Sequence, residues 1–369
     1  MRKVSSRRAV VLGLLVAGLL FAWTPVVRHV RAAEFLSRLS QKSAPDAPRL
    51  STEDLAINGR NGPIRARLYF REGAKPGPAI VVAHGVHYRG IDEARLVPFV
   101  RALAEGGLTV LTPELSELAD YRITKSGVDV IKDSVRYLAT RRDHVAGEQV
   151  GLLGFSFAGG LSLVAVEDAE TAHFVSSVTS VGGHHDLRRV LRFLIHNEIE
   201  TPTGIVHLQA HDYGLVVLVY GNLEHFVPAQ DLPAMRAGFK AWLHSDQKSA
   251  REAAKARTSP EAERLWQLLE TGHLQTLAPE LDALLQRQSA ELAALSSVGH
   301  LKQLKVPVYL LHGSHDTVIP PSETDAANLE LDGTEHRALV SPLLEHVEVS
   351  KTAGLVDKLA LVSFMAKVL

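Results

Sequence analysis

The feature that most constrains the fold of this chain is a series of short, largely apolar segments separated by segments with helical spacing. Apolar runs occupy residues 79–83, 108–112, 150–155, 174–181 and 306–311. A strand that is apolar on both faces is typical of a parallel sheet covered by helices on both sides. We therefore predict an α/β fold with a mostly parallel, doubly covered sheet, in which ligands bind outside the carboxyl ends of the strands.

The run at residues 150–155 ends in a sharp turn that carries a hydroxyl group. It continues as VGLLGFSFAGGL, with Ser156 between the strand and a segment that has helical character. Gly154 and Ala158 flank Ser156 at two residues' distance and match the small-x-Ser-x-small pattern of a nucleophile elbow, although Ala158 replaces the usual glycine. The alternative is an ordinary strand-to-helix turn in which Ser156 caps the helix.

Acidic and basic groups follow two later strands. A serine hydroxyl is a poor nucleophile unless a base removes its proton and a third group orients that base. Asp316 lies in the sequence HGSHD after the strand at 306–311, and His346 follows the last predicted strand at 336–340. The chain order is therefore serine, aspartate, histidine.

These features together resemble the α/β-hydrolase superfamily over nearly the whole chain, apart from the first 50 residues and a helical insertion. The resemblance implies that Ser156 is the nucleophile, His346 the general base and later acid, and Asp316 the carboxylate that orients the imidazole. It also implies an oxyanion hole formed by the backbone N–H groups of Phe157 and Val86. The expected activity is hydrolysis of carboxylic esters through an acyl-enzyme.

Each of these assignments has a competitor. Asp186 follows the preceding strand and could replace Asp316, which in turn could be a turn-forming residue. His336 competes with His346, but it begins its strand at the end away from the site. His84, directly after the strand at 79–83, is favoured as a structural hydrogen bonder over a substrate contact.

The 18 histidines and the absence of cysteine bear on metal binding. Without cysteine, thiolate metal sites and disulfides are excluded. His184 and His185 are adjacent, so their side chains diverge, and no HExxH spacing occurs. We predict no metal and no cofactor, and keep His84, His184 and His185 as candidates for the lining of a substrate pocket.

The start of the chain predicts export. Basic residues at positions 2, 3, 7 and 8 precede an uncharged run at residues 9–27, about the length that spans a bilayer. We favour an uncleaved signal anchor over a cleaved signal, and both place the folded domain outside the cytoplasm. The chain has 40 basic and 41 acidic residues, a net charge of -1, which gives no support to nucleic-acid binding.

The predicted organisation has five parts: an anchor at 1–32, a linker at 33–50, a first part of the core at 51–203, an all-helical cap insertion at 204–300, and a second part of the core at 301–369. The insertion falls between the sixth and seventh core strands. By the resemblance, it shapes the pocket and excludes water. Residues 215–219 and Phe226 either face that pocket or pack the insertion onto the core.

The same machinery allows two other functions. An acyltransferase would pass the acyl group to an envelope lipid or sugar, and a catalytically silent member of the fold would bind a partner or lipid at the membrane surface. A dehalogenase is disfavoured because that chemistry needs a carboxylate where Ser156 stands. The expected partners are a small or lipid-like acyl substrate and the membrane.

Overall fold

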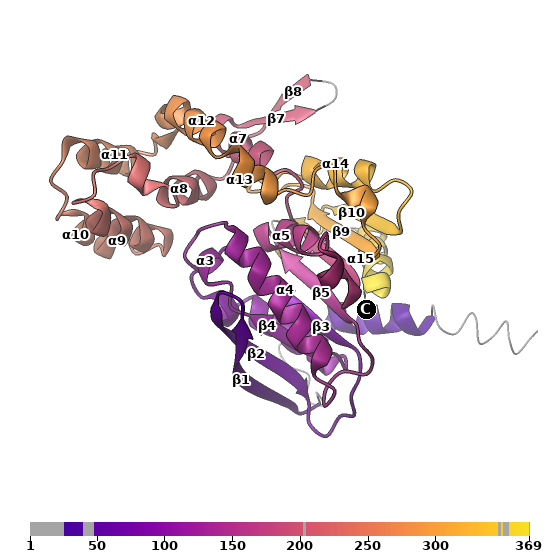
Figure 1. Ribbon diagram of the computed structural model, residues 1–369. Coiled ribbons are helices and arrows are strands. Elements are labelled where there is room, and N and C mark those ends of the chain that lie inside the picture. Colours follow the sequence, from indigo (N-terminus) through magenta and orange to yellow (C-terminus); the bar gives the residue numbers. More distant parts are fainter. Residues whose placement is uncertain (1–25, 40–47, 202–203, 346–347, 350–353, 369) are drawn as a thin grey trace, which may run out of the picture.

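An eight-stranded sheet forms the centre of the molecule (Figure 1). The computed structural model describes residues 26–39, 48–201, 204–345, 348–349 and 354–368. The strand order is β1-β2-β4-β3-β5-β6-β9-β10. The strands are β1 (Leu50–Gly59), β2 (Gly62–Arg71), β3 (Ala79–Ala83), β4 (Thr109–Pro113), β5 (Val150–Phe155), β6 (Val175–Val181), β9 (Val308–Gly313) and β10 (His336–Ser341).

Parallel pairing brings the ends of the central strands to one edge. β1 and β2 form an antiparallel hairpin, β2 pairs antiparallel with β4, and every pair from β4 to β10 is parallel. Phe155 aligns with Val181, and Val181 aligns with Leu311. The residues that follow β5, β6 and β9 therefore share one edge of the sheet. The predicted mostly parallel sheet is confirmed.

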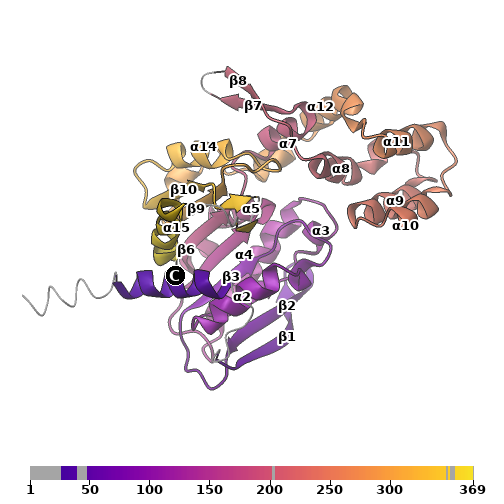
Figure 2. The ribbon, with the colours of Figure 1, turned by 180° about the vertical axis from the view of Figure 1, so that it is seen from behind.

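Helices cover both faces of this sheet (Figures 1 and 2). α4 (Lys125–Thr140) and α5 (Phe157–Ala165) pack in one apolar cluster with one face of the strands. α2 (Leu96–Glu105), α15 (Leu355–Val368) and a helix over residues 26–39 pack in a second cluster on the opposite face. The remaining short elements of the core are α3 (Ser116–Ala119), α6 (Ala169–His173), α14 (Ser322–Glu330), β11 (Leu344–Glu345) and β12 (Glu348–Val349).

The insertion between β6 and β9 begins earlier than predicted and is not entirely helical. Its helices are α7 (Leu187–His196), α8 (Asp212–Tyr220), α9 (Leu232–Leu243), α10 (Gln247–Ala254), α11 (Pro260–Glu270), α12 (Ala278–Arg287) and α13 (Ser289–Ala294). A hairpin of β7 (Glu198–Thr201) and β8 (Gly204–His207) projects from it, away from the core (Figure 1). Strands of four residues are too short to give a clear alternating pattern, so the sequence did not predict them.

The predicted linker at 33–50 is wrong in its first part. A helix covers residues 26–39, with Ala32 and Phe35 buried against the core. The apolar side chains at 32, 35, 36 and 39 recur with helical spacing, which the sequence analysis overlooked. Within the described residues, no helix has the length and apolarity needed to cross a membrane. Residues 1–25, which contain most of the predicted anchor, lie outside them.

Candidate active site

Ser156 occupies a strained turn between β5 and α5. Its backbone has φ 53° and ψ −132°, outside the regions that non-glycine residues favour. Such a conformation costs on the order of 1–3 kcal/mol and persists only where the surrounding structure imposes it. The Ser156 side chain makes no capping hydrogen bond to the fully described first turn of α5. The alternative role as a helix cap therefore has no support in the geometry.

Close packing explains the small residues around this turn. A Cβ atom at Gly154 would lie 2.3 Å from the carbonyl oxygen of Ala158 and 2.5 Å from Ser162 Oγ. Gly154 is thus required by sterics, because the carbonyl is part of the backbone and cannot simply rotate away. Ala158 is fully buried, and its methyl group is part of the core cluster on this face. The replacement of the usual glycine by Ala158 is accommodated.

The segment after β3 lies directly against the turn. A Cβ at Gly85 would approach Ser156 Cβ to 3.2 Å, so the chain passes the nucleophile at close range. Val86 is the next residue, and its carbonyl oxygen accepts a hydrogen bond of 3.4 Å from Tyr213 Oη on α8. Phe157 begins α5, where the first backbone N–H groups have no partner within the helix. Val86 and Phe157 thus flank Ser156 from two segments.

His84 fixes the backbone rather than offering a free ring nitrogen. Its Nε2 accepts a hydrogen bond of 2.9 Å from the N–H of Leu115, so Nδ1 donates to the carbonyl of Gly85 at 2.8 Å. Burial lowers the pKa of His84, which keeps the ring neutral. The side chain lines a cavity at Ser156, but both ring nitrogens are already bonded.

Asp316 is buried in the loop after β9, at the same edge of the sheet as Ser156. Its Oδ1 accepts hydrogen bonds from the N–H groups of Val318 and Ile319, at 2.9 and 3.0 Å. Its Oδ2 lies 3.5 Å from Nε2 of the buried His312, which also bonds to the carbonyl of Ile319 at 2.8 Å. These contacts hold the carboxylate in one orientation.

The competing residues have other partners or other positions. Asp186 Oδ1 accepts a hydrogen bond from the N–H of Arg189 and caps α7. His336 begins β10 opposite Val308 at the start of β9, at the end of the sheet remote from Ser156. His346, the predicted general base, lies outside the described residues, between the two-residue strands β11 and β12.

His184 and His185 tie the insertion to the core. His184 Nε2 bonds to the carbonyl of Leu295 at 2.9 Å. His185 lies 3.0 Å from Ser297 Oγ through Nδ1 and 3.1 Å from Glu330 Oε2 through Nε2. Neither residue is found among the described residues lining the two cavities below. No group of three or more His, Asp or Glu side chains within the described part of the chain is placed to hold a metal ion.

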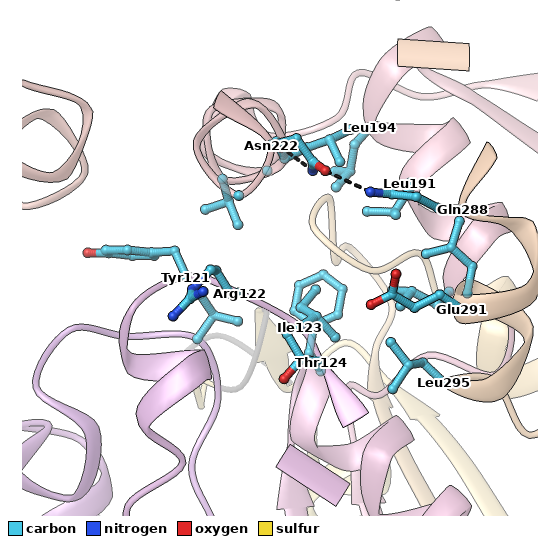
Figure 3. A pocket seen from close by; sticks show the side chains of 18 of the residues that line it. Tyr121, Arg122, Ile123, Thr124, Leu191, Leu194, Asn222, Gln288, Glu291 and Leu295 are labelled. Atoms are coloured by element: carbon cyan, nitrogen blue, oxygen red, sulfur yellow. Dashed lines mark hydrogen bonds between the residues drawn. The ribbon is translucent and has the colours of Figure 1, made fainter. Parts of the chain in front are cut away.

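A cavity of about 270 Å³, here called the cap cavity, separates the insertion from the core (Figure 3). Val86 and Phe157 border it, and Tyr121 and Arg122 of the core lie on the side opposite Glu291 of α13. On its upper side, Gln288 donates a hydrogen bond of 2.9 Å to Asn222, which fixes two polar side chains of the wall. Of the insertion residues suggested from the sequence, 215–219 and Phe226, Val217 and Leu218 line this cavity.

A second cavity of about 540 Å³, here called the inner cavity, contains Ser156 in its wall. Most of its lining is apolar and comes from the central strands, α2, α15 and the helix over residues 26–39. Val86 borders both cavities, so they meet the Ser156–Phe157 turn from two sides. Both volumes are close to or within the range of roughly 300–1,000 Å³ found for small-molecule sites.

Comparison with known proteins identifies the fold. No family model matches the chain, and no curated protein matches it in sequence. The ligand-bound rice cell wall degrading esterase LipA from Xanthomonas oryzae superposes with a TM-score of 0.54, at 16% identity, over 91% of this chain and 93% of its own. This chain has the α/β-hydrolase fold. A second form of LipA gives a TM-score of 0.53 at 16% identity, covering 85% and 88%.

A more distant likeness is found to an esterase from Pyrobaculum calidifontis. It has a TM-score of 0.45 and 18% identity, over 94% of this chain and 92% of its own, too low a score to support an argument. At such identities the α/β-hydrolase fold is shared, but the reaction has to be argued from the site itself.

Most of the residues that line the two cavities were not predicted from the sequence. Tyr213, whose pKa is raised by burial, lies 6.2 Å from Tyr121 between ring centroids, and both line the cap cavity. No periodic pattern indicates such a pair, because the two residues come from separate segments. Leu36 and Leu39 of the inner cavity had a visible signal in their helical spacing.

Proposed function

We propose that this protein is a serine hydrolase of carboxylic esters that works through an acyl-enzyme on Ser156. The observation that carries the proposal is the backbone of Ser156, strained at φ 53° while its side chain makes no capping hydrogen bond to the described first turn of α5. Strain of this kind is retained where function needs it. The turn presents the Ser156 hydroxyl at the carboxyl edge of a parallel sheet, in the wall of the inner cavity and next to Phe157, which lines the cap cavity.

The proposed reaction has two halves. Ser156 Oγ attacks the ester carbonyl carbon while His346 removes its proton, and the oxyanion accepts hydrogen bonds from the N–H groups of Phe157 and Val86. Each such donor contributes about 3 kcal/mol to transition-state stabilisation. His346 then protonates the leaving alcohol. A water molecule, activated by His346, hydrolyses the acyl-enzyme and restores Ser156, and Asp316 orients the imidazole throughout.

Chain geometry supports the assignment of His346. Leu344, two residues earlier, lines the inner cavity together with Ser156. Asp316 follows β9, and β10, the strand that leads to this segment, pairs directly with β9. Asp316 and the segment that contains His346 thus follow two paired strands, and a single strand, β6, separates β9 from β5, which leads to Ser156.

Labelling with a fluorophosphonate probe tests the nucleophile. The folded full-length protein should react, and mass spectrometry should find the adduct on Ser156. Ser156→Ala should abolish labelling and reduce kcat for p-nitrophenyl acetate by several orders of magnitude. The matched control is Ser176→Ala, which removes an exposed hydroxyl at the start of β6, at the end of the sheet remote from Ser156, and should keep the label. Folded protein that is not labelled would contradict the proposal.

We also propose that residues 1–32 anchor the protein in a membrane, with the catalytic domain outside the cytoplasm. The basic start and the apolar run at 9–27 support this. In an export-competent host, the full chain should remain in the membrane pellet after alkaline carbonate washing and be accessible to protease added from outside. Release by the wash would argue for a cleaved signal, and protection from protease would contradict the orientation.

A further inference from the structure

The inner cavity, which Ser156 lines, and the cap cavity, which the next residue Phe157 lines, lie on opposite faces of the sheet. Residues of the inner cavity, such as Leu153, Leu311 and Met365, belong to the apolar cluster that contains α2 and α15. Those of the cap cavity, such as Phe157 and Leu187, belong to the cluster on the other face. An ester bound with its carbonyl at Ser156 can therefore direct its two substituents into different compartments.

The charge of the two linings differs. Glu93 and Arg95 are the charged side chains found among the described residues of the inner cavity, and they pair with each other at 2.8 Å. Burial lowers the pKa of His87, also in its wall, which favours the neutral ring. The cap cavity, with half the volume, is lined by three charged side chains, Arg122, Glu224 and Glu291. The inner cavity is the compartment suited to a hydrocarbon chain.

The helix over residues 26–39 forms part of this inner wall. Phe35 packs edge-on against Phe99 of α2, with ring centroids 5.4 Å apart, and Phe99 packs edge-on against Phe155 at 5.0 Å. Phe155 directly precedes Ser156. Leu36 and Leu39 continue the wall on the same helix, half-buried. An aromatic row thus links this helix to the nucleophile.

We infer that the inner cavity holds the acyl chain of a medium- or long-chain fatty ester, and that the helix over residues 26–39 sets the length it accepts. The inference rests on the proposed function, since the acyl chain has to be attached at Ser156. An engineered apolar cavity of about 150 Å³ is enough to bind benzene, and the inner cavity has about 540 Å³. The cap cavity then receives the more polar alcohol part.

A series of p-nitrophenyl esters tests this, with the full chain in detergent. Burial of each methylene group is expected to raise kcat/KM by up to about fourfold, so octanoate should exceed acetate by a hundredfold or more. Leu36→Trp should lower the octanoate-to-acetate ratio by tenfold or more, because the indole occupies space in the cavity. Val30→Trp, on the exposed side of the same helix, is the matched control and should leave the ratio unchanged.

Met365→Trp fills the inner cavity from α15 instead. It provides a second test in case Leu36→Trp fails to fold. Equal kcat/KM for acetate and octanoate in the wild type, or a ratio that neither variant lowers, would overturn the inference and leave the proposed function intact. Binding of a fluorescent fatty acid to the Ser156→Ala protein tests the acyl site independently of the proposed hydrolase activity. Binding that weakens at least tenfold with Leu36→Trp supports the acyl site even if no ester is hydrolysed, and absent binding refutes it.

Discussion

Glycines allow the start of α5 to pack closely against the sheet behind Ser156. A Cβ at Gly159 would lie 2.6 Å from Ser180 Oγ, and one at Gly160 would lie 2.3 Å from the ring of His184. A Cβ at Gly183 would be equally close, at 2.2 Å from Ser180 Oγ. The turn at Ser156 is held by this close packing of glycine backbone against Ser180 and His184, so its strain depends on residues outside the proposed catalytic set.

Gly154→Ala is the sharpest test of that dependence. The added methyl group would overlap the carbonyl of Ala158, and overpacking of this kind costs typically about 1–3 kcal/mol. We expect a lower free energy of unfolding in urea and loss of fluorophosphonate labelling at Ser156. Gly77→Ala, where the nearest atom is 3.8 Å away, should change neither quantity. Unchanged labelling in Gly154→Ala would show that the turn is not sterically determined.

Buried histidines make the folded state sensitive to acid. Burial lowers the pKa of His84 and of His184, so the native protein binds fewer protons there than the unfolded chain does. Their stabilising contribution is complete above the unfolded pKa of about 6.5 and is lost as the pH falls towards the folded value. The free energy of unfolding should fall by about 1.4 kcal/mol per pH unit for each such histidine.

Urea denaturation between pH 8 and pH 5 measures this slope. His84→Gln keeps a side chain able to donate and accept, but removes the titrating group, so its slope should be smaller by about one proton. An identical slope in the variant and the wild type would mean that His84 is already protonated in the fold, or that its pKa is not lowered.

At the level of elements, α14 secures the start of the insertion. Glu323 on this helix is fully buried, and its Oε2 accepts hydrogen bonds from the N–H groups of His185 and Asp186, at 2.9 and 2.7 Å. Its other oxygen pairs with Arg189 Nε on α7 at 2.5 Å. One carboxylate therefore connects a core helix to the segment where the chain leaves the sheet.

Glu323→Ala should destabilise the protein strongly. It would leave two buried N–H groups without an acceptor and Arg189 without its partner, a loss of about 3–5 kcal/mol for a buried pair. Glu252→Ala, which removes an exposed pair with Lys255, should cost less than about 1 kcal/mol. Thermal and urea unfolding measure the free energy of unfolding of both variants against the wild type. A small effect of Glu323→Ala would mean that the insertion is held by its apolar contacts alone.

Elements with a strong local pattern were predictable, and those without one were not. The strand predicted at 79–83 has the bounds of β3, and the predicted final strand differs from β10 by one residue. Their apolar runs are unbroken by competing signals. The hairpin β7–β8 has strands of four residues, and the order of the strands in the sheet depends on contacts between distant segments that no local pattern records.

At the level of the whole molecule, the candidate site could be predicted because its residues sit where strands end. Ser156 and Asp316 lie at the predicted edge of the sheet, since parallel topology brings together segments that are 160 residues apart. The general base, His346, stays a prediction. The walls of both cavities could not be anticipated, because they are assembled from the insertion, α15 and the helix over residues 26–39.

The packing of the helix over residues 26–39 against the core has a consequence for the distance between the folded domain and a membrane that holds the proposed anchor. An extended linker over residues 33–50 would have allowed a reach of about 60 Å from a membrane. Instead, Ala32 is already buried in the domain, only five residues after the apolar run ends at residue 27, a helical rise of about 7.5 Å. With the proposed anchor at residues 1–32 in a membrane, the enzyme would act on substrates in that same membrane and would not reach a facing one.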